Sequence, residues 1–112
     1  MSFDYPLSKQ EVFVSFVDRL REIAPDVATA FRGLREAADA AGPLDAKQRE
    51  LALLTGFAAT RNEGGFRVHC TRASQAGASV DEIRQVVILL LGTCLGLVPV
   101  VEALTWLNDE LG

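Results

Sequence analysis

The sequence predicts an all-α protein of about six helices with short connections and antiparallel neighbours. Apolar residues recur at intervals of three and four, which is the period of a helix with one buried face. Capping boxes and helix-ending glycines mark the helix limits along the whole chain. No alternation of apolar and polar residues lasts long enough to indicate a strand. The chain has 112 residues, so we expect residues 1–112 to form a single domain with a modest core.

Two helices are predicted in the first third of the chain. Ser8 and Glu11 form a capping box that opens a helix ending near Ala24. Pro25 suits the first turn of the second helix, which stops at Gly42. Apolar residues recur at helical spacing in both segments: Val12, Phe13, Phe16, Val17 and Leu20 in the first, and Val27, Phe31, Leu34 and Ala38 in the second.

The middle of the chain predicts a helical hairpin. Asp45 and Gln48 form a second capping box, and the helix that they open runs to about Arg61. The NEGG segment, residues 62–65, breaks the helical pattern. A short fourth helix then covers residues 66–76 and ends before Gly77.

An uncharged run dominates the last third of the chain. Ser79 and Glu82 form a third capping box, whose helix leads into residues 86–101, VVILLLGTCLGLVPVV. Gly92 and Gly96 weaken this helix, and Pro99 restarts a sixth helix that reaches Leu111. The run is shorter than the roughly 20 residues of a membrane span. We therefore interpret it as the most buried part of the protein, reaching a subunit interface.

Composition narrows the classes of partner. The 11 basic and 15 acidic residues give a net charge of −4 without a basic patch, which disfavours nucleic acid. No secretory signal is visible and the two cysteines lack metal or redox spacing, so we expect a cytoplasmic protein with reduced thiols. One histidine without clustered carboxylates predicts no metal, and no cofactor motif is present. Because 49% of the residues are apolar, we expect a homo-oligomer, with a tightly packed monomer as the alternative.

Glu50 and His69 are the candidate catalytic residues. A helical projection places Glu50 on the apolar stripe of the third helix, and His69, the single histidine, on that of the fourth. If these helices pack antiparallel, the two side chains face a common space, where a carboxylate and an imidazole can move a proton. Asn62 and Phe66 lie on the same side as His69, and Cys70 and Arg72 flank it. The alternative is a structural core histidine with a glutamate favoured by the helix dipole.

Residues 44–90, LDAKQRELALLTGFAATRNEGGFRVHCTRASQAGASVDEIRQVVILL, resemble the carboxymuconolactone decarboxylase and alkylhydroperoxidase-D-like family. The shared features are the LDAKQREL start, the interval from His69 to Gly77, and the AGASVDEI turn. The resemblance implies a small orthogonal helical bundle that assembles as trimers or hexamers. It also implies sites between helices, at or near subunit interfaces.

The two branches of this family imply different chemistry. The peroxidase branch has a glutamate, a C-x-x-C motif and a histidine. Glu50 and His69 match the first and last of these, but Asn62 and Gly65 occupy the cysteine positions, so disulfide-based peroxide reduction cannot take its usual route. The decarboxylase branch has a phrase close to FRLH before its histidine, and residues 66–69 read FRVH.

Three functional hypotheses follow. In the first, a lyase-like enzyme acts by proton transfer on a small carboxylate or lactone metabolite, with Glu50 and His69 as catalytic residues. Its substrate-binding residues would be Asn62, Phe66, Arg67 and Arg72, with either arginine as the carboxylate anchor. In the second, Cys70 supports thiol peroxidase activity with a lowered thiol pKa, whereas the alternative interpretation makes Cys70 and Cys94 small buried hydrophobic residues. In the third, the chain is a non-catalytic oligomeric family member.

Overall fold

The computed structural model describes residues 8–112, except for the side chains of residues 11–15. It is all-helical, as predicted, with helices α1 (Lys9–Ile23), α2 (Pro25–Asp39), α3 (Ala46–Ala59), α4 (Glu63–Gln75), α5 (Val80–Ile88) and α6 (Leu97–Leu111). Within the described residues, the only strand-like pairing is an isolated bridge between Leu91 and Leu95. The predicted capping box of Ser8 and Glu11 involves a side chain outside the described residues, as do Val12 and Phe13 of the first apolar pattern. No helix in the described part is long and apolar enough to cross a membrane.

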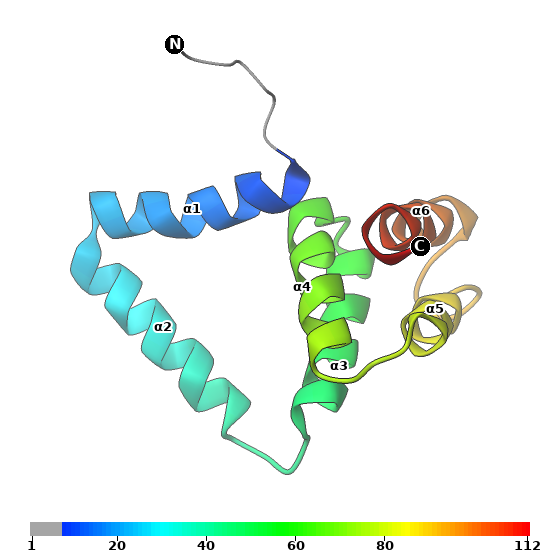
Figure 1. Ribbon diagram of the computed structural model, residues 1–112, viewed down its shortest axis with the longest axis horizontal. Coiled ribbons are helices and arrows are strands. Elements are labelled where there is room, and N and C mark those ends of the chain that lie inside the picture. Colours follow the sequence, from blue (N-terminus) through cyan, green and yellow to red (C-terminus); the bar gives the residue numbers. More distant parts are fainter. Residues whose placement is uncertain (1–7) are drawn as a thin grey trace.

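Helix α4 lies at the centre of the molecule. It packs against α1, α3 and α6, and Figure 1 shows it running beside α3 in the opposite direction. Its buried residues are Gly65, Phe66, Val68, His69, Cys70 and Ala73. The core forms where this helix meets α3, α5 and α6, with contributions from Leu54, Ile83, Val87, Val100 and Leu107. The core therefore covers one side of α4, and its other side faces α1 and the space beyond.

The turn between α3 and α4 differs from the prediction. The helical pattern is interrupted as predicted, but the break covers residues 60–62, so only Asn62 of the NEGG segment lies outside a helix and α4 begins at Glu63 rather than Phe66. Asn62 is the N-cap, and its side-chain oxygen accepts a hydrogen bond from the Gly65 amide at 3.0 Å. The cap and an acidic residue in the first turn stabilise a helix start that contains two glycines. The predicted capping box of Asp45 and Gln48 at the start of α3 is present.

The uncharged run was expected to be the most buried segment, and this expectation is wrong. It splits into the end of α5, a tight turn with Gly92 at φ +80°, and the start of α6 at Leu97 rather than Pro99. Each helix end buries only one face, so Val87 and Val100 enter the core while Leu97 stays 65% exposed. The exposed residues of this run form an apolar corner: Ile88, Leu89, Leu91, Leu97, Val98 and Val101.

Helices α1 and α2 form an arm that is joined to α4 through the start of α1, while α2 stands away from the α3–α4 hairpin (Figure 1). Helix α1 packs on α4, and the main packing partner of α2 is α1. Pro25 lies in the first turn of α2, as predicted, but the helix ends at Asp39, before Gly42. The far end of α2 approaches the body through an ion pair between Asp39 and Arg49 at 3.9 Å. The predicted apolar stripe of α2 is therefore exposed, and Leu34 is 64% accessible.

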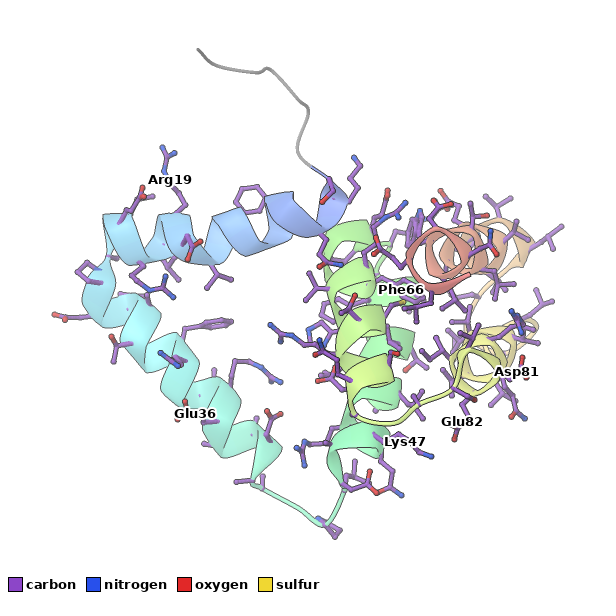
Figure 2. All side chains as sticks on the ribbon, viewed as in Figure 1. Arg19, Glu36, Lys47, Phe66, Asp81 and Glu82 are labelled. Atoms are coloured by element: carbon purple, nitrogen blue, oxygen red, sulfur yellow. The ribbon has the colours of Figure 1, made fainter. Side chains whose placement is uncertain are left out.

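Ion pairs join the outer helices to the central hairpin. Lys47 on α3 donates to Glu82 on α5 at 2.8 Å, and both residues are labelled in Figure 2. This hydrogen-bonded pair raises the pKa of Lys47 and lowers the pKa of Glu82, because each charge favours the other. Both side chains are substantially exposed, so we expect the pair to orient α5 more than to stabilise it.

Gly65 provides the close approach of α3 to α4. A Cβ atom at this position would lie 2.5 Å from Cε1 and 2.6 Å from Cδ1 of Phe57. We predict that Gly65→Ala lowers the free energy of unfolding by about 1–2 kcal/mol, because overpacking outweighs the better helix propensity of alanine. Urea denaturation followed by circular dichroism measures this loss.

Gly56→Ala is the matched control, since Gly56 lies in α3 and a Cβ atom there would meet no other atom within 4 Å. We expect this variant to be stabilised by about 0.5–1 kcal/mol through helix propensity alone. Equal stability changes in the two variants would contradict a tight contact at Gly65.

Candidate functional site

His69 and Glu50 meet across the α3–α4 hairpin. The distance between Nδ1 of His69 and Oε2 of Glu50 is 2.5 Å. His69 is only 7% exposed, and the Glu50 side chain is largely buried. The antiparallel packing of consecutive helices brings together two residues that are 19 positions apart. The predicted juxtaposition of the acid and the imidazole is therefore present.

Phe57 holds the other side of the imidazole. Its ring centroid lies 4.8 Å from that of His69, with an interplanar angle of 30°. The same phenyl ring packs over Gly65, where a larger residue would collide with it. The ring of His69 is thus fixed by a carboxylate at Nδ1 and by a phenyl group on its face, which restricts its orientation.

The remaining nitrogen of His69, Nε2, has no hydrogen-bond partner in the described part of the chain. His69 contributes to the wall of a cavity of about 730 Å³ between the arm and the α3–α4 hairpin. The cavity is lined by Val17, Leu20, Arg21, Pro25, Ala28, Thr29, Phe31, Arg32, Arg35, Leu53, Phe57, His69 and Arg72. His69 is therefore the member of this pair that lines the cavity.

Arg72 lies beside His69 on the cavity wall. The two residues are three positions apart on α4, so they share one face of the helix. Among the side chains that the structure describes, Arg72 has no partner in an ion pair or a hydrogen bond. A guanidinium with available donors next to an imidazole can bind a carboxylate and hold it within reach of a proton donor.

The other predicted substrate-binding residues lie elsewhere. Asn62 lines an adjoining hollow of about 520 Å³, which shares Val17, Leu20 and Phe31 with the cavity. Phe66, labelled in Figure 2, is fully buried in the core, where it packs edge-on against Trp106 at 5.7 Å. The structure therefore brings Asn62 near the cavity but turns Phe66 to the opposite side of α4.

Arg67 connects α4 to α6 rather than lining the cavity. Its guanidinium pairs with Glu63 at 3.0 Å, with Asp109 at 3.0 Å and with Glu110 at 3.1 Å. Burial opposes the charged form of this group, but its hydrogen bonds to the three carboxylates outweigh burial and raise the pKa of Arg67. Of the two anchors that the sequence proposed, only Arg72 lies at the cavity.

Cys70 has the environment of a core residue. It is fully buried among the apolar residues that join α4 to α6. Burial raises the pKa of its thiol to about 12, and the negative charge of Glu110 acts in the same direction. The thiol is therefore protonated at neutral pH, which argues against the thiol peroxidase hypothesis. Cys94 is also a free thiol, but it is exposed, because it lies in the turn that splits the uncharged run.

The positions of the absent C-x-x-C motif have a structural role here. Asn62 and Gly65 are joined by the hydrogen bond that caps α4, and Gly65 also allows the contact with Phe57. Among the described residues, no group of three His, Cys, Asp or Glu side chains lies close enough to bind a metal ion. The ionisable groups available at the cavity are therefore an acid–base pair and arginines.

Sequence reasoning missed the arm side of the cavity. Arg21 on α1 and Arg32 and Arg35 on α2 lie more than 30 residues before His69 and meet it only in the folded chain. A sequence signal existed, because Arg32 and Arg35 are three residues apart beside the apolar stripe of α2. Their relation to the hairpin could not be obtained from that pattern.

Comparison with known proteins identifies one family. The sequence model described as "Carboxymuconolactone decarboxylase family" matches residues 25–109, which is more than half of the chain. The search of curated proteins returned no match, and neither did the search of solved structures. The matched segment includes α2 to α6 and therefore both Glu50 and His69.

The two cysteines should differ sharply in reactivity. We predict that iodoacetamide at pH 8 alkylates Cys94 in the native protein and leaves Cys70 unmodified, because a buried thiol with a pKa of about 12 supplies almost no thiolate. Peptide mass spectrometry measures both sites, and unfolding in guanidinium should expose Cys70. Rapid modification of Cys70 in the native state would contradict this description.

Proposed function

Because the chain belongs to the carboxymuconolactone decarboxylase family, we propose that it acts by proton transfer on a small carboxylate or lactone metabolite, with Glu50 and His69 as catalytic residues. One observation carries this proposal. The Nδ1 atom of His69 is held by Glu50, and His69 lines a cavity that Arg72 also lines. This arrangement supplies a proton donor and a carboxylate anchor on one helix face.

The proposed reaction is a decarboxylation. The C–C bond to the leaving carboxylate breaks, and its electron pair passes into the conjugated carbonyl system of the substrate. Carbon dioxide leaves, and the carbon takes the Nε2 proton of the His69 imidazolium, which becomes neutral imidazole and regains a proton from solvent. Glu50 accepts a hydrogen bond from Nδ1 and so fixes the ring with Nε2 towards the substrate. Arg72 would bind a carboxylate of the substrate and so position the reacting carbon within reach of this proton.

We also propose that the protein works as a homo-oligomer, a trimer or hexamer. The support lies in two separate apolar surfaces, the stripe of α2 and the apolar corner of α5 and α6. Exposed apolar areas of this kind mark protein–protein contacts. Two different surfaces suit a head-to-tail contact, in which the arm of one copy covers the corner of the next and the ring closes.

Activity should depend on the acid–base pair. We predict that His69→Gln lowers kcat by about 10²–10⁴-fold, because the product carbon loses its proton donor. Glu50→Gln should have a smaller effect, since it mainly disturbs ring orientation. The assay follows carbon dioxide release from carboxymuconolactone and other unsaturated lactone acids. Run in D₂O, it should place one deuterium on the product carbon.

A control variant and a folding check separate an effect on the reaction from an effect on folding. Arg84→Gln removes an exposed arginine on α5 and should leave kcat and KM unchanged, whereas Arg72→Gln should raise KM. Circular dichroism and thermal melts check that each variant is folded. Full activity of folded His69→Gln, or no turnover by the wild-type protein on any lactone acid, would refute the proposed reaction.

The oligomer should dissociate when either apolar surface is made polar. We predict that Leu34→Gln on α2 and Val98→Gln on α6 each shift the native mass towards the monomer of 12.1 kDa. Multi-angle light scattering measures this mass. Ser74→Gln, at an exposed polar position of α4, is the control and should keep the wild-type mass. A wild-type protein that is monomeric at high concentration would contradict the proposed assembly.

A further inference from the structure

We infer that the cavity binds an amphipathic carboxylate, in which the anionic group is joined to an extended apolar body. This inference rests on the proposed function, because it names the class of acid that would reach His69. The evidence is the combination of charge, wall composition and volume at the cavity, together with the orientation of α2.

The charged side chains that line the cavity are basic, although the net charge of the protein is negative. The chain carries a net charge of −4, yet the charged side chains that line the cavity besides His69 are all arginines: Arg21, Arg32, Arg35 and Arg72. No aspartate or glutamate belongs to the described lining. Four of the 11 basic residues thus line one hollow; three of them have a carboxylate partner on their own helix that does not line it, and the guanidinium donors that face the hollow favour an anion over a cation.

The walls between these arginines are apolar. Val17, Leu20, Phe31, Leu53 and Phe57 line the cavity. Its volume of about 730 Å³ lies within the range of sites that enclose drug-sized ligands. A lactone acid of ordinary size would leave much of this apolar surface in contact with water. An acid with a long apolar body would cover it and gain free energy from burial.

The arginines of the arm keep donors available for a ligand. Arg21 pairs with Asp18, Arg32 with Glu36 and Arg35 with Asp39, each within one helix. These pairs are exposed, and the distance between Arg32 and Glu36 is long at 3.6 Å. Pairs of this type contribute little free energy, and each guanidinium has five N–H groups. A ligand carboxylate can therefore share or displace these partners.

The orientation of α2 favours a small anion over a second copy of the chain in this cavity. Phe31, Arg32 and Arg35 lie on the cavity side of α2, while Val27 and Leu34 do not line the cavity. The apolar stripe of α2 is therefore divided, with Phe31 in the cavity wall and Val27 and Leu34 outside it. A subunit contact can use Val27 and Leu34 while the arginines still face the ligand.

Decanoate is a suitable probe, with three reference compounds. Isothermal titration calorimetry on the full chain should show one decanoate bound per subunit, and acetate, decanol and decyltrimethylammonium should each bind at least about tenfold more weakly. The lone histidine gives one imidazole signal in NMR, and decanoate but not acetate should shift it.

Matched arginine variants locate the anionic group. We expect the double variant Arg32→Gln/Arg35→Gln to bind decanoate about tenfold more weakly, since a charge-assisted hydrogen bond is lost. Arg19→Gln is the control, because Figure 2 shows Arg19 pointing away from α2 on the outer side of α1. The control should bind decanoate as the wild-type protein does.

Several results would overturn this inference. The first is equal affinity for decanoate and decyltrimethylammonium, and the second is unchanged decanoate affinity in the double variant. The third is a double variant that loses both its oligomeric state and decanoate binding, which would indicate that a second copy of the chain occupies the cavity. The proposed reaction fails separately. Decanoate binding without turnover of any acid would refute only the reaction, whereas turnover of lactone acids without decanoate binding would refute only the inference.

Discussion

The close packing of α3 against α4 is the constraint on which the site depends. It requires a glycine at position 65, because the ring of Phe57 occupies the space that a side chain would fill. The same ring stacks on His69, and Glu50 reaches the imidazole from one side of it. Helix spacing, ring orientation and the hydrogen bond between acid and imidazole are therefore coupled. A change that moves the two helices apart would loosen all three together.

Two opposite sides of α4 serve different purposes. On one side, Phe66 and Cys70 enter the core, and Arg67 joins the helix to α6 through three carboxylates. On the other, His69 and Arg72 face the cavity below the arm. Because the first side fixes the helix in place, the second can present polar groups in a defined geometry without contributing to the core. Rigid support behind a polar site is what precise positioning requires.

Asn62 and Gly65 occupy the two cysteine positions of the peroxidase branch, and both have a structural role in this chain. Where the peroxidase branch has two cysteines, this chain has a helix cap and a close helix contact. The remaining thiol near the site, Cys70, points into the core with a raised pKa. The ionisable groups that stay near the cavity are an imidazole, a carboxylate and arginines, which suit proton transfer and anion binding better than redox chemistry.

Local sequence signals were enough to predict the helices, and they placed Glu50 opposite His69 on the condition that the third and fourth helices pack antiparallel. Capping boxes and apolar periodicity are local signals, and a short turn between two helices leaves antiparallel packing as the simplest arrangement. Local signals could not show that the uncharged run would split and expose Leu97, or that Arg67 would face α6 while Arg72 faces the cavity. These points and the position of the arm depend on contacts between segments that are distant along the chain, and no helical period encodes such contacts.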